Sequence, residues 1–270
     1  MGFTKMHALG NDFIVIDVRE SIPEGITELS KRLCHRRLGI GADQLILLLK
    51  SDIGDLRMRI FNSDGGEVEM CGNGIRCLAK YIWDRGISEK DTLNIETLAG
   101  IIKPSKAGSL VSVDMGVPIL EGKDIPVNIS GRVIDYPLEI QDRLFNITCV
   151  SMGNPHAVIF VKSVSGFPVS HYGPLIERHQ LFPKRTNVEF VEVLTPTHIK
   201  MRVWERGSGE TPACGTGASA SVVAGILKGL TERNVRVELQ YGDLFIEWTS
   251  ESPVYMTGPA EEVFEGQIDI

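Results

Sequence analysis

The sequence predicts an α+β protein built of two similar β-rich lobes, each wrapped around one central helix. Two observations carry this prediction. Two Cys-Gly-x-Gly motifs, which begin at Cys71 and Cys214, lie 143 residues apart, and many other residues repeat at that offset. Nine runs with the length and the apolar or β-branched character of strands surround two segments with helical spacing. A period this long indicates two domain-sized copies with approximate two-fold symmetry rather than a solenoid.

The repeat extends along most of both halves without a gap. Matched positions include Gly10 with Gly153, Asn11 with Asn154, Val15 with Val158, Arg59 with Arg202, Gly66 with Gly209 and Gly86 with Gly229. We expect an N-terminal lobe at residues 1–118 and a C-terminal lobe at 119–262, with a tail at about 263–270 that returns to the first lobe. The active site is expected in the cleft between the lobes.

Short strands dominate the predicted elements. In chain order they are FIVID, QLILLL, LRMRIF, TLNIET, HAVIFV, VEFVEV, IKMRVW, VRVELQ and DLFIEW, most of them bounded by Gly, Pro, Asn or Asp. After each Cys-Gly-x-Gly motif the pattern changes to apolar or small residues at helical spacing, which ends at Gly86 or Gly229, residues suited to a helix C-terminus. Each motif therefore begins a helix, and the nearly all-apolar second helix is predicted to be buried.

Composition excludes several classes of protein. With 270 residues and 43% hydrophobic residues the chain can bury one large core or two modest ones. Its formal charge of -7, with basic residues scattered, lacks the basic stripe of a nucleic-acid-binding protein. No apolar run is long enough for a membrane span, and no secretory signal is evident. Five cysteines, an odd and sparse set, fit reduced thiols, so we expect a cytoplasmic protein without nucleic-acid or membrane partners.

The two repeated cysteines are the candidate chemical groups. The first turn of a helix presents unpaired N–H groups and the positive end of the dipole, which favour anions and lower the pKa of a cysteine placed there. Two such thiols facing one small molecule suit stereochemical inversion, in which one group removes a proton and the other delivers one to the opposite face. Cys34, Cys77 and Cys149 lie in apolar or helical contexts and are expected to be inert packing residues.

Other classes remain for comparison. Zinc binding would need paired Cys or His at short spacing, and nucleotide binding would need a Gly-x-Gly-x-x-Gly or P-loop pattern; neither is present. A Cys-His acyl-transfer enzyme would leave the second matched thiol unexplained. A non-catalytic pair of lobes that grips a small acid with its helix ends would need neither thiol, and it stays an alternative.

The segments FTKMHALGNDFIVID, GIGADQ, FNSDGGEVEMCGNGIRC, GNPHAV, TNVEFV and ERGSGETPACGTGA, in this order and spacing, closely resemble the diaminopimelate epimerase family. The resemblance spans nearly the whole chain. Asn73 stands where the related proline racemases have His after Cys-Gly; the departures, Ala8 and Ser208, are small. The resemblance implies interconversion of LL- and meso-diaminopimelate in lysine and peptidoglycan-precursor synthesis, without cofactor or metal, by a homodimer. An epimerase of another amino acid is the alternative enzyme.

The resemblance also implies site residues. Cys71 and Cys214 are the implied acid/base pair, and His156 and Glu205 the residues that tune their ionisation. The implied substrate contacts are Asn11, Gln44, Asn62, Gly72, Asn73, Asn154, Asn187, Glu205, Arg206, Gly215 and Thr216. Most of these are mates in the repeat. Where mates differ, as at Asn62 and Glu205, the two ends of the ligand must be treated differently, with Arg206 suited to a carboxylate and Glu205 to an ammonium.

Overall fold

The computed structural model describes residues 1–249 and 252–269 and divides the chain into two compact units. Unit 1 comprises Met1–Asp114 and the C-terminal segment from Thr257, and unit 2 comprises Met115–Met256. The chain thus changes unit at 114/115 and 256/257, where the sequence predicted 118/119 and about 262/263. Residue 270 of the predicted tail lies outside the described residues.

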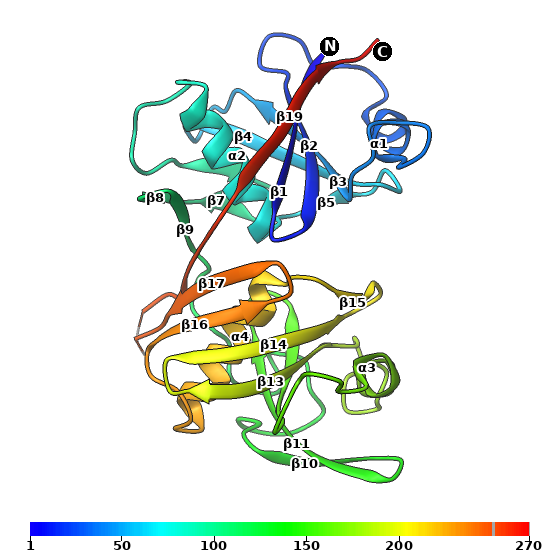
Figure 1. The fold of residues 1–270 in the computed structure, drawn as a ribbon, viewed down its shortest axis with the longest axis vertical. Coiled ribbons are helices and arrows are strands. Elements are labelled where there is room, and N and C mark those ends of the chain that lie inside the picture. Colours follow the sequence, from blue (N-terminus) through cyan, green and yellow to red (C-terminus); the bar gives the residue numbers. More distant parts are fainter. Residues whose placement is uncertain (250–251, 270) are drawn as a thin grey trace. The chain divides into compact units, whose positions relative to one another are not determined.

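Unit 1 contains a mixed sheet in the order β19-β1-β2-β3-β4-β6-β7, with β5 paired to β4 (Figure 1). Its strands are β1 (Gly2–Ala8), β2 (Asn11–Asp17), β3 (Gln44–Leu49), β4 (Leu56–Asn62), β5 (Glu67–Val68), β6 (Ile95–Thr97), β7 (Gly100–Ile102) and β19 (Glu261–Gln267), with the hairpin β8 (Pro104–Ala107) and β9 (Leu110–Asp114). Its helices are α1 (Ile26–Cys34) and α2 (Gly72–Asp84).

Unit 2 contains the matching order β10-β11-β12-β13-β14-β16-β17, with β15 paired to β14. Its strands are β10 (Tyr136–Ile140), β11 (Arg143–Ser151), β12 (Pro155–Phe160), β13 (Asn187–Thr195), β14 (His198–Glu205), β15 (Gly209–Thr211), β16 (Asn234–Leu239) and β17 (Gly242–Glu247). Its helices are α3 (Val169–Glu177) and α4 (Gly215–Leu227), and β18 (Tyr255–Gly258) carries the chain back toward unit 1.

The two units share one topology. Helices α1 and α3, and likewise α2 and α4, begin and end at residues 143 apart. The parallel pairs also match, because β2/β3 corresponds to β12/β13 and β4/β6 to β14/β16. The predicted α+β fold of two duplicated, helix-centred β-rich units is confirmed. Helices α1 and α3 were not predicted. The units also differ in their first strand: β19, which pairs with β1, comes from the far end of the chain, whereas β10, which pairs with β11, directly precedes it.

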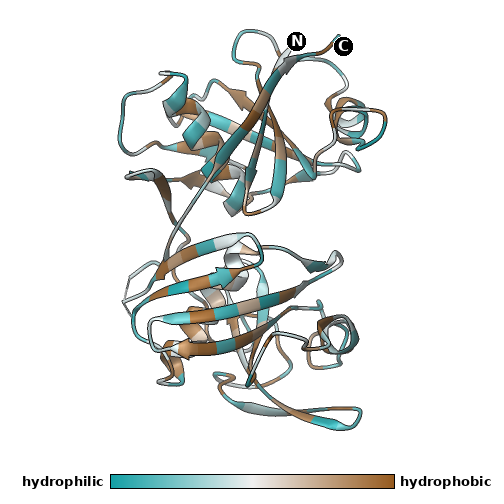
Figure 2. Ribbon diagram, viewed as in Figure 1, coloured by the Kyte–Doolittle hydropathy of each residue, from teal (hydrophilic) through white to brown (hydrophobic). Residues whose placement is uncertain are grey.

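Helices α2 and α4 each pack against the sheet of their own unit (Figure 1). Along α2 the apolar face of Ile75, Leu78 and Ile82 is fully buried. In α4 every residue from Gly217 to Gly225 is buried, and Figure 2 shows apolar colouring along that helix. Burial of both helix starts places the capping cysteines at the end of a rigid, packed element. No helix in the described part of the chain is long and apolar enough to cross a membrane.

Candidate active site

Both repeated cysteines are helix N-caps. Cys71 precedes α2 and Cys214 precedes α4, and both have the extended backbone typical of the N-cap position. The Cys71 Sγ accepts a hydrogen bond from the Gly74 N–H at 3.4 Å. Cys71 is partly exposed, whereas only 6% of Cys214 is exposed. Each thiol therefore lies where unpaired backbone N–H groups favour an anion.

In unit 1, a chain of side-chain amides leads to Cys71. The Asn11 Oδ1 lies 3.8 Å from the Cys71 Sγ and accepts a hydrogen bond of 3.2 Å from the Asn73 Nδ2. The Asn11 Nδ2 donates to the Asp43 Oδ2 at 2.9 Å. A carboxylate only accepts, so Asp43 fixes the Asn11 amide with its oxygen toward the thiol.

The other end of this chain is Arg76, which is fully buried in the first turns of α2. Its Nη2 donates to the Asn73 Oδ1 at 3.0 Å, its Nη1 to the Gly72 carbonyl at 3.1 Å, and its Nε to the Pro259 carbonyl at 3.3 Å. Burial lowers the pKa of Arg76 to about 10, which leaves it charged at neutral pH. The unit 1 chain thus runs from a group that only donates to a group that only accepts.

A second network, made of charged side chains, holds the Asp43 carboxylate that bonds to Asn11. Arg36 bonds to both Asp12 and Asp43, and Lys5 also bonds to Asp12. Burial alone would raise the pKa of Asp12, but the hydrogen bonds from Arg36 and Lys5 outweigh it and lower that pKa to about 2. Asp43, which orients Asn11, is therefore held in an ionic cluster.

Gln44 and Asn62 form a pair on neighbouring strands. The Gln44 Nε2 donates to the Asn62 Oδ1 at 2.8 Å, across the antiparallel β3/β4 register. The Gln44 Oε1 is buried and has no hydrogen-bond partner in the structure. An amide oxygen without a partner is costly to bury, so it is available to a ligand that donates a hydrogen bond.

In unit 2, an unbroken chain of hydrogen bonds leads from a buried carboxylate to Cys214. The Glu189 Oε1 lies 2.7 Å from the His156 Nδ1, and the His156 Nε2 lies 3.0 Å from the Asn154 Oδ1. The Asn154 Nδ2 donates to the Thr216 Oγ1 at 3.3 Å, and that hydroxyl lies 3.4 Å from the Cys214 Sγ. Glu189 and His156 are both fully buried.

The electrostatic surroundings of Cys214 favour the thiol. Burial raises its pKa well above the ordinary value, and the carboxylates of Glu205 and Glu189 raise it further. Burial also raises the pKa of Glu205, against the opposing hydrogen bond from Thr211. Hydrogen bonding with the Thr216 hydroxyl opposes this shift and favours the thiolate.

The remaining predicted site residues of unit 2 lie around this chain. Asn187 is buried, donates to the Pro155 carbonyl at 2.9 Å and accepts from the Arg206 N–H at 2.9 Å. The exposed Arg206 side chain donates to the Lys184 carbonyl at 3.2 Å. Gly215 opens α4, and its carbonyl accepts the Ser219 hydroxyl at 3.0 Å.

Sequence reasoning missed two buried charged residues, Glu189 and Arg76. Their mates in the repeat are Ile46 and Ser219. The sequence did contain a signal for both residues. Each is a charged residue whose mate in the repeat is uncharged, and each lies on an element that leads to a cysteine. The same comparison places His156 opposite Phe13.

The other three cysteines are buried, as predicted. Burial raises the pKa of Cys34 to about 11 and raises those of Cys77 and Cys149 further, which keeps all three as unreactive thiols. Among the described residues, no group of three or more His, Cys, Asp or Glu side chains is placed to hold a metal ion.

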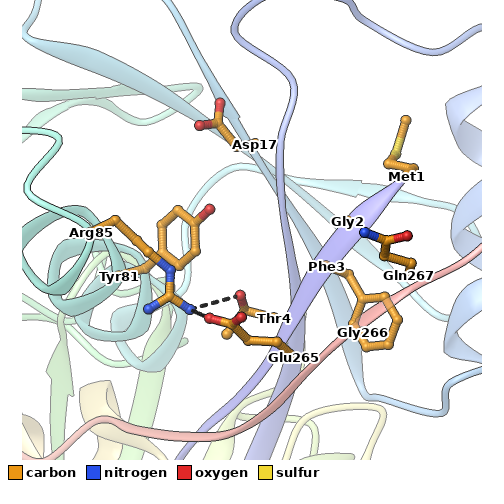
Figure 3. A pocket seen from close by; sticks show the side chains of 10 residues that line it. All are labelled: Met1, Gly2, Phe3, Thr4, Asp17, Tyr81, Arg85, Glu265, Gly266 and Gln267. Atoms are coloured by element: carbon orange, nitrogen blue, oxygen red, sulfur yellow. Dashed lines mark hydrogen bonds and ion pairs between the residues drawn. The ribbon is translucent and has the colours of Figure 1, made fainter.

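A separate pocket of about 520 Å³ lies in unit 1 and contains none of the predicted site residues (Figure 3). Arg85, stacked over Tyr81, points into it but already pairs with Glu262 and Glu265. The charge of Arg85 is therefore compensated by these two carboxylates. The pocket is lined by Met1, Gly2, Phe3, Thr4, Asp17, Tyr81, Arg85, Glu265, Gly266 and Gln267.

The sequence profile of the diaminopimelate epimerase family matches residues 3–121 and 148–263. A diaminopimelate epimerase from Pelotomaculum thermopropionicum is 56% identical over 99% of this chain and 98% of its own length. Another, from Moorella thermoacetica, is 54% identical over the whole of both chains. The chain belongs to the diaminopimelate epimerase family. It is therefore an isomerase, and the resemblance seen in the sequence is confirmed.

Solved structures share the fold at low identity. A phenazine biosynthesis protein of the PhzF family from Bacillus anthracis superimposes with a TM-score of 0.72 at 20% identity, covering 100% of this chain and 99% of that one. A probable proline racemase from Agrobacterium radiobacter gives a TM-score of 0.69 at 15% identity, covering 100% of this chain and 93% of that one. These likenesses show the two-unit fold alone.

Proposed function

We propose that this epimerase interconverts LL- and meso-diaminopimelate with Cys71 and Cys214 as its two acid/base groups, one on each face of the reacting α-carbon. The observation that carries the proposal is the pair of cysteine N-caps at matched helix starts. One thiolate removes the α-proton while the other group, as a thiol, delivers a proton to the opposite face. The reverse reaction exchanges the two roles.

The helix starts do more than hold the sulfurs. The backbone N–H groups after Cys71 and Cys214, at Gly72, Asn73, Gly215 and Thr216, bind the carboxylate of the reacting carbon and stabilise the charge that develops as its proton leaves. Preorganised donors of this kind lower the barrier because they need no reorientation during the reaction. No metal and no organic cofactor takes part in the proposed reaction.

The rest of the substrate is held by groups that differ between the units. Asn11, Gln44, Asn62, Asn154 and Asn187 supply neutral donors and acceptors. The buried, unpartnered Gln44 Oε1 suits an ammonium donor. Arg206 pairs with the carboxylate of the distant end and Glu205 with an ammonium, while Glu205 and His156 also tune the thiols. These unequal partners make only one end of the substrate reactive.

The decisive experiment is isotope incorporation. Incubation with LL-diaminopimelate in D2O, with no metal or pyridoxal phosphate added, is expected to place one solvent deuterium at one α-carbon of the meso product. Cys71→Ala and Cys214→Ala should each lower kcat by about 10²–10⁴-fold, as expected for loss of a general acid or base. Cys149→Ala is the matched control. Wild-type turnover in either of the first two variants refutes the two-base assignment.

The active form is proposed to be a cytoplasmic homodimer. Strand β19 lies at the edge of the unit 1 sheet, and its Val263 and Phe264 side chains are exposed. The unpaired backbone groups of an edge strand, together with these two exposed apolar side chains, offer a surface to a second copy of the chain. Phe264→Asp should shift the mass measured by sedimentation equilibrium from dimer to monomer; a monomeric wild-type protein at micromolar concentration contradicts the proposal.

A further inference from the structure

The hydrogen-bond chain that ends at Cys214 can exist in two polarities. With the Asn154 amide as it stands, both ring nitrogens of His156 face oxygen atoms, Glu189 Oε1 and Asn154 Oδ1. This is the arrangement of an imidazolium, which donates from both nitrogens. The donors then continue from the Asn154 Nδ2 to the Thr216 Oγ1, which leaves the hydroxyl hydrogen of Thr216 for the Cys214 sulfur.

The opposite polarity requires one amide rotation. If His156 keeps only the proton on Nδ1, which Glu189 holds, its Nε2 must accept, and the Asn154 amide turns to donate to it. The Asn154 oxygen then accepts from Thr216, whose oxygen accepts in turn from the Cys214 S–H. Thr216 permits both states because a hydroxyl donates and accepts equally well.

The two states contain the same number of protons. In the first, His156 is an imidazolium and Cys214 a thiolate; in the second, the ring is neutral and Cys214 is a thiol. The ring loses one proton and the sulfur gains one, so the total charge of the cluster is the same in both states. The amide carries no proton and transmits only orientation, so the proton leaves the ring to solvent and the sulfur takes one up separately.

We propose that Glu189 is a positioning residue for the epimerase reaction, which holds the proton on His156 Nδ1 and thereby lets the His156–Asn154–Thr216 chain match the charge of Cys214 to that of the imidazole. Three observations support this role. Glu189 is fully buried with His156 at 2.7 Å, and its Oε2 has no partner. A Cβ at position 217 would lie only 2.7 Å from its Oε1, so Gly217 makes room for the carboxylate.

The corresponding chain in unit 1 has no such freedom. It runs from Arg76, which only donates, to Asp43, which only accepts, so the amides of Asn73 and Asn11 cannot reverse. Charged groups facing Cys214 come from three strands: His156 on β12, Glu189 on β13 and Glu205 on β14. His156 and Glu189 belong to the relay, whereas Glu205 hydrogen-bonds with Cys214 directly.

The direct effect and the relay effect of Glu189 on Cys214 have opposite signs. Glu189 is a nearby anion, so by direct repulsion Glu189→Gln should make the Cys214 thiolate easier to form and speed its alkylation. Through the relay, the neutral glutamine no longer favours the imidazolium, which leaves the chain in the polarity that favours the thiol. We therefore expect alkylation of Cys214 to slow, by about tenfold at pH 8 for a shift of one pKa unit.

The experiment measures iodoacetamide labelling of Cys214 against pH, by peptide mass spectrometry on the full-length protein without substrate. Glu192→Gln is the matched control, because this β13 carboxylate bonds to the Val164 N–H and takes no part in the relay. Thr216→Val should slow labelling and remove the slowing caused by Glu189→Gln, which leaves only the direct effect of the lost anion, a faster labelling. Thr216→Ser should preserve the slowing. Far-UV circular dichroism identifies any variant that fails to fold, and Thr216→Ser, which retains the hydroxyl, keeps the relay testable.

Faster labelling in Glu189→Gln, or slowing of equal size in the Thr216→Val background, overturns the relay. The inference rests on the proposed function only in treating Cys214 as an acid/base group, and labelling needs no turnover. A failed relay is thus distinguishable from a failed epimerase assay. In turnover, Glu189→Gln should lower kcat by about 10–100-fold, the usual cost of losing an outer partner of a functional side chain, and alter the pH profile.

Discussion

At the start of α2, Gly74 packs against the apolar ends of Phe13, Ile46 and Ile60, whereas at the start of α4, Gly217 packs against the carboxylate of Glu189. The strand order matches in the two units, and their helices have equal lengths at a constant offset. The side chains facing the two helix starts have diverged. Duplication thus supplies two equal cysteine caps, and a few substitutions give the two thiols different electrostatic surroundings.

The difference extends to the placement of charge. Unit 1 buries a cation, Arg76, in the helix behind its thiol, and unit 2 buries a hydrogen-bonded carboxylate and imidazole, Glu189 and His156, beside its own. The reaction needs one thiolate and one thiol, and unequal surroundings bias which of the two cysteines holds its proton before substrate binds. The following substitutions test whether matched residues of the two units contribute differently to stability.

The largest effect is expected at Arg76. Arg76→Met should lower the free energy of unfolding by about 2–4 kcal/mol, because it leaves the Asn73 Oδ1 and the Pro259 carbonyl without this donor in a buried region. Its mate Ser219 makes one local bond to the Gly215 carbonyl, and Ser219→Ala should cost only about 0.5–1.5 kcal/mol. Urea denaturation followed by circular dichroism compares them. Equal losses contradict a special role for Arg76.

A smaller difference is expected at the two matched glycines. Gly217→Ala should destabilise the protein by about 1–2 kcal/mol, since the new methyl group would displace Glu189 and overpacking outweighs the better helix propensity of alanine. Gly74→Ala meets only movable side-chain ends at 3.1–3.4 Å and should stay within about 1 kcal/mol of wild type. Thermal unfolding of both variants compares the two losses of stability. A larger loss in Gly74→Ala than in Gly217→Ala would contradict the prediction.

The smallest effect is expected on stability at acid pH, through Asp12 in the ionic cluster beside Asn11. The pKa of Asp12 is lowered to about 2 in the folded state, so its contribution is complete above its unfolded value near 4 and is lost as pH falls through that window. The free energy of unfolding of the wild type should fall by about 1 kcal/mol more between pH 5 and pH 3 than that of Asp12→Asn. Parallel pH dependence of the two proteins in urea titrations would refute the assignment.

The sequence was informative wherever the repeat could be read. It located both capping cysteines and the two central helices, because a fixed offset transfers an observation from one half to the other. It missed α1 and α3, whose amphipathic patterns are short. It also missed Glu189 and Arg76, because an alternating strand or a helix face shows where a side chain points but not which distant group it meets.

The strand order was likewise beyond the sequence. Pairing of β1 with β19 joins opposite ends of the chain, and no local pattern encodes it. The orientation of the Asn11 and Asn154 amides depends on partners contributed by other elements, Asp43 and His156. The motifs predict which residues form the candidate site, and the direction of their hydrogen bonds comes from the structure.

The most direct test of unequal thiols is competitive labelling of the wild-type protein. Substoichiometric iodoacetamide at pH 7.5, followed by peptide mapping, reports the reactivity of Cys71 and Cys214 in one sample. Cys214 is buried and faces two carboxylates that raise its pKa, whereas Cys71 is partly exposed and accepts a backbone N–H. Cys71 should therefore label at least about tenfold faster. Equal labelling, or faster labelling of Cys214, would contradict the account.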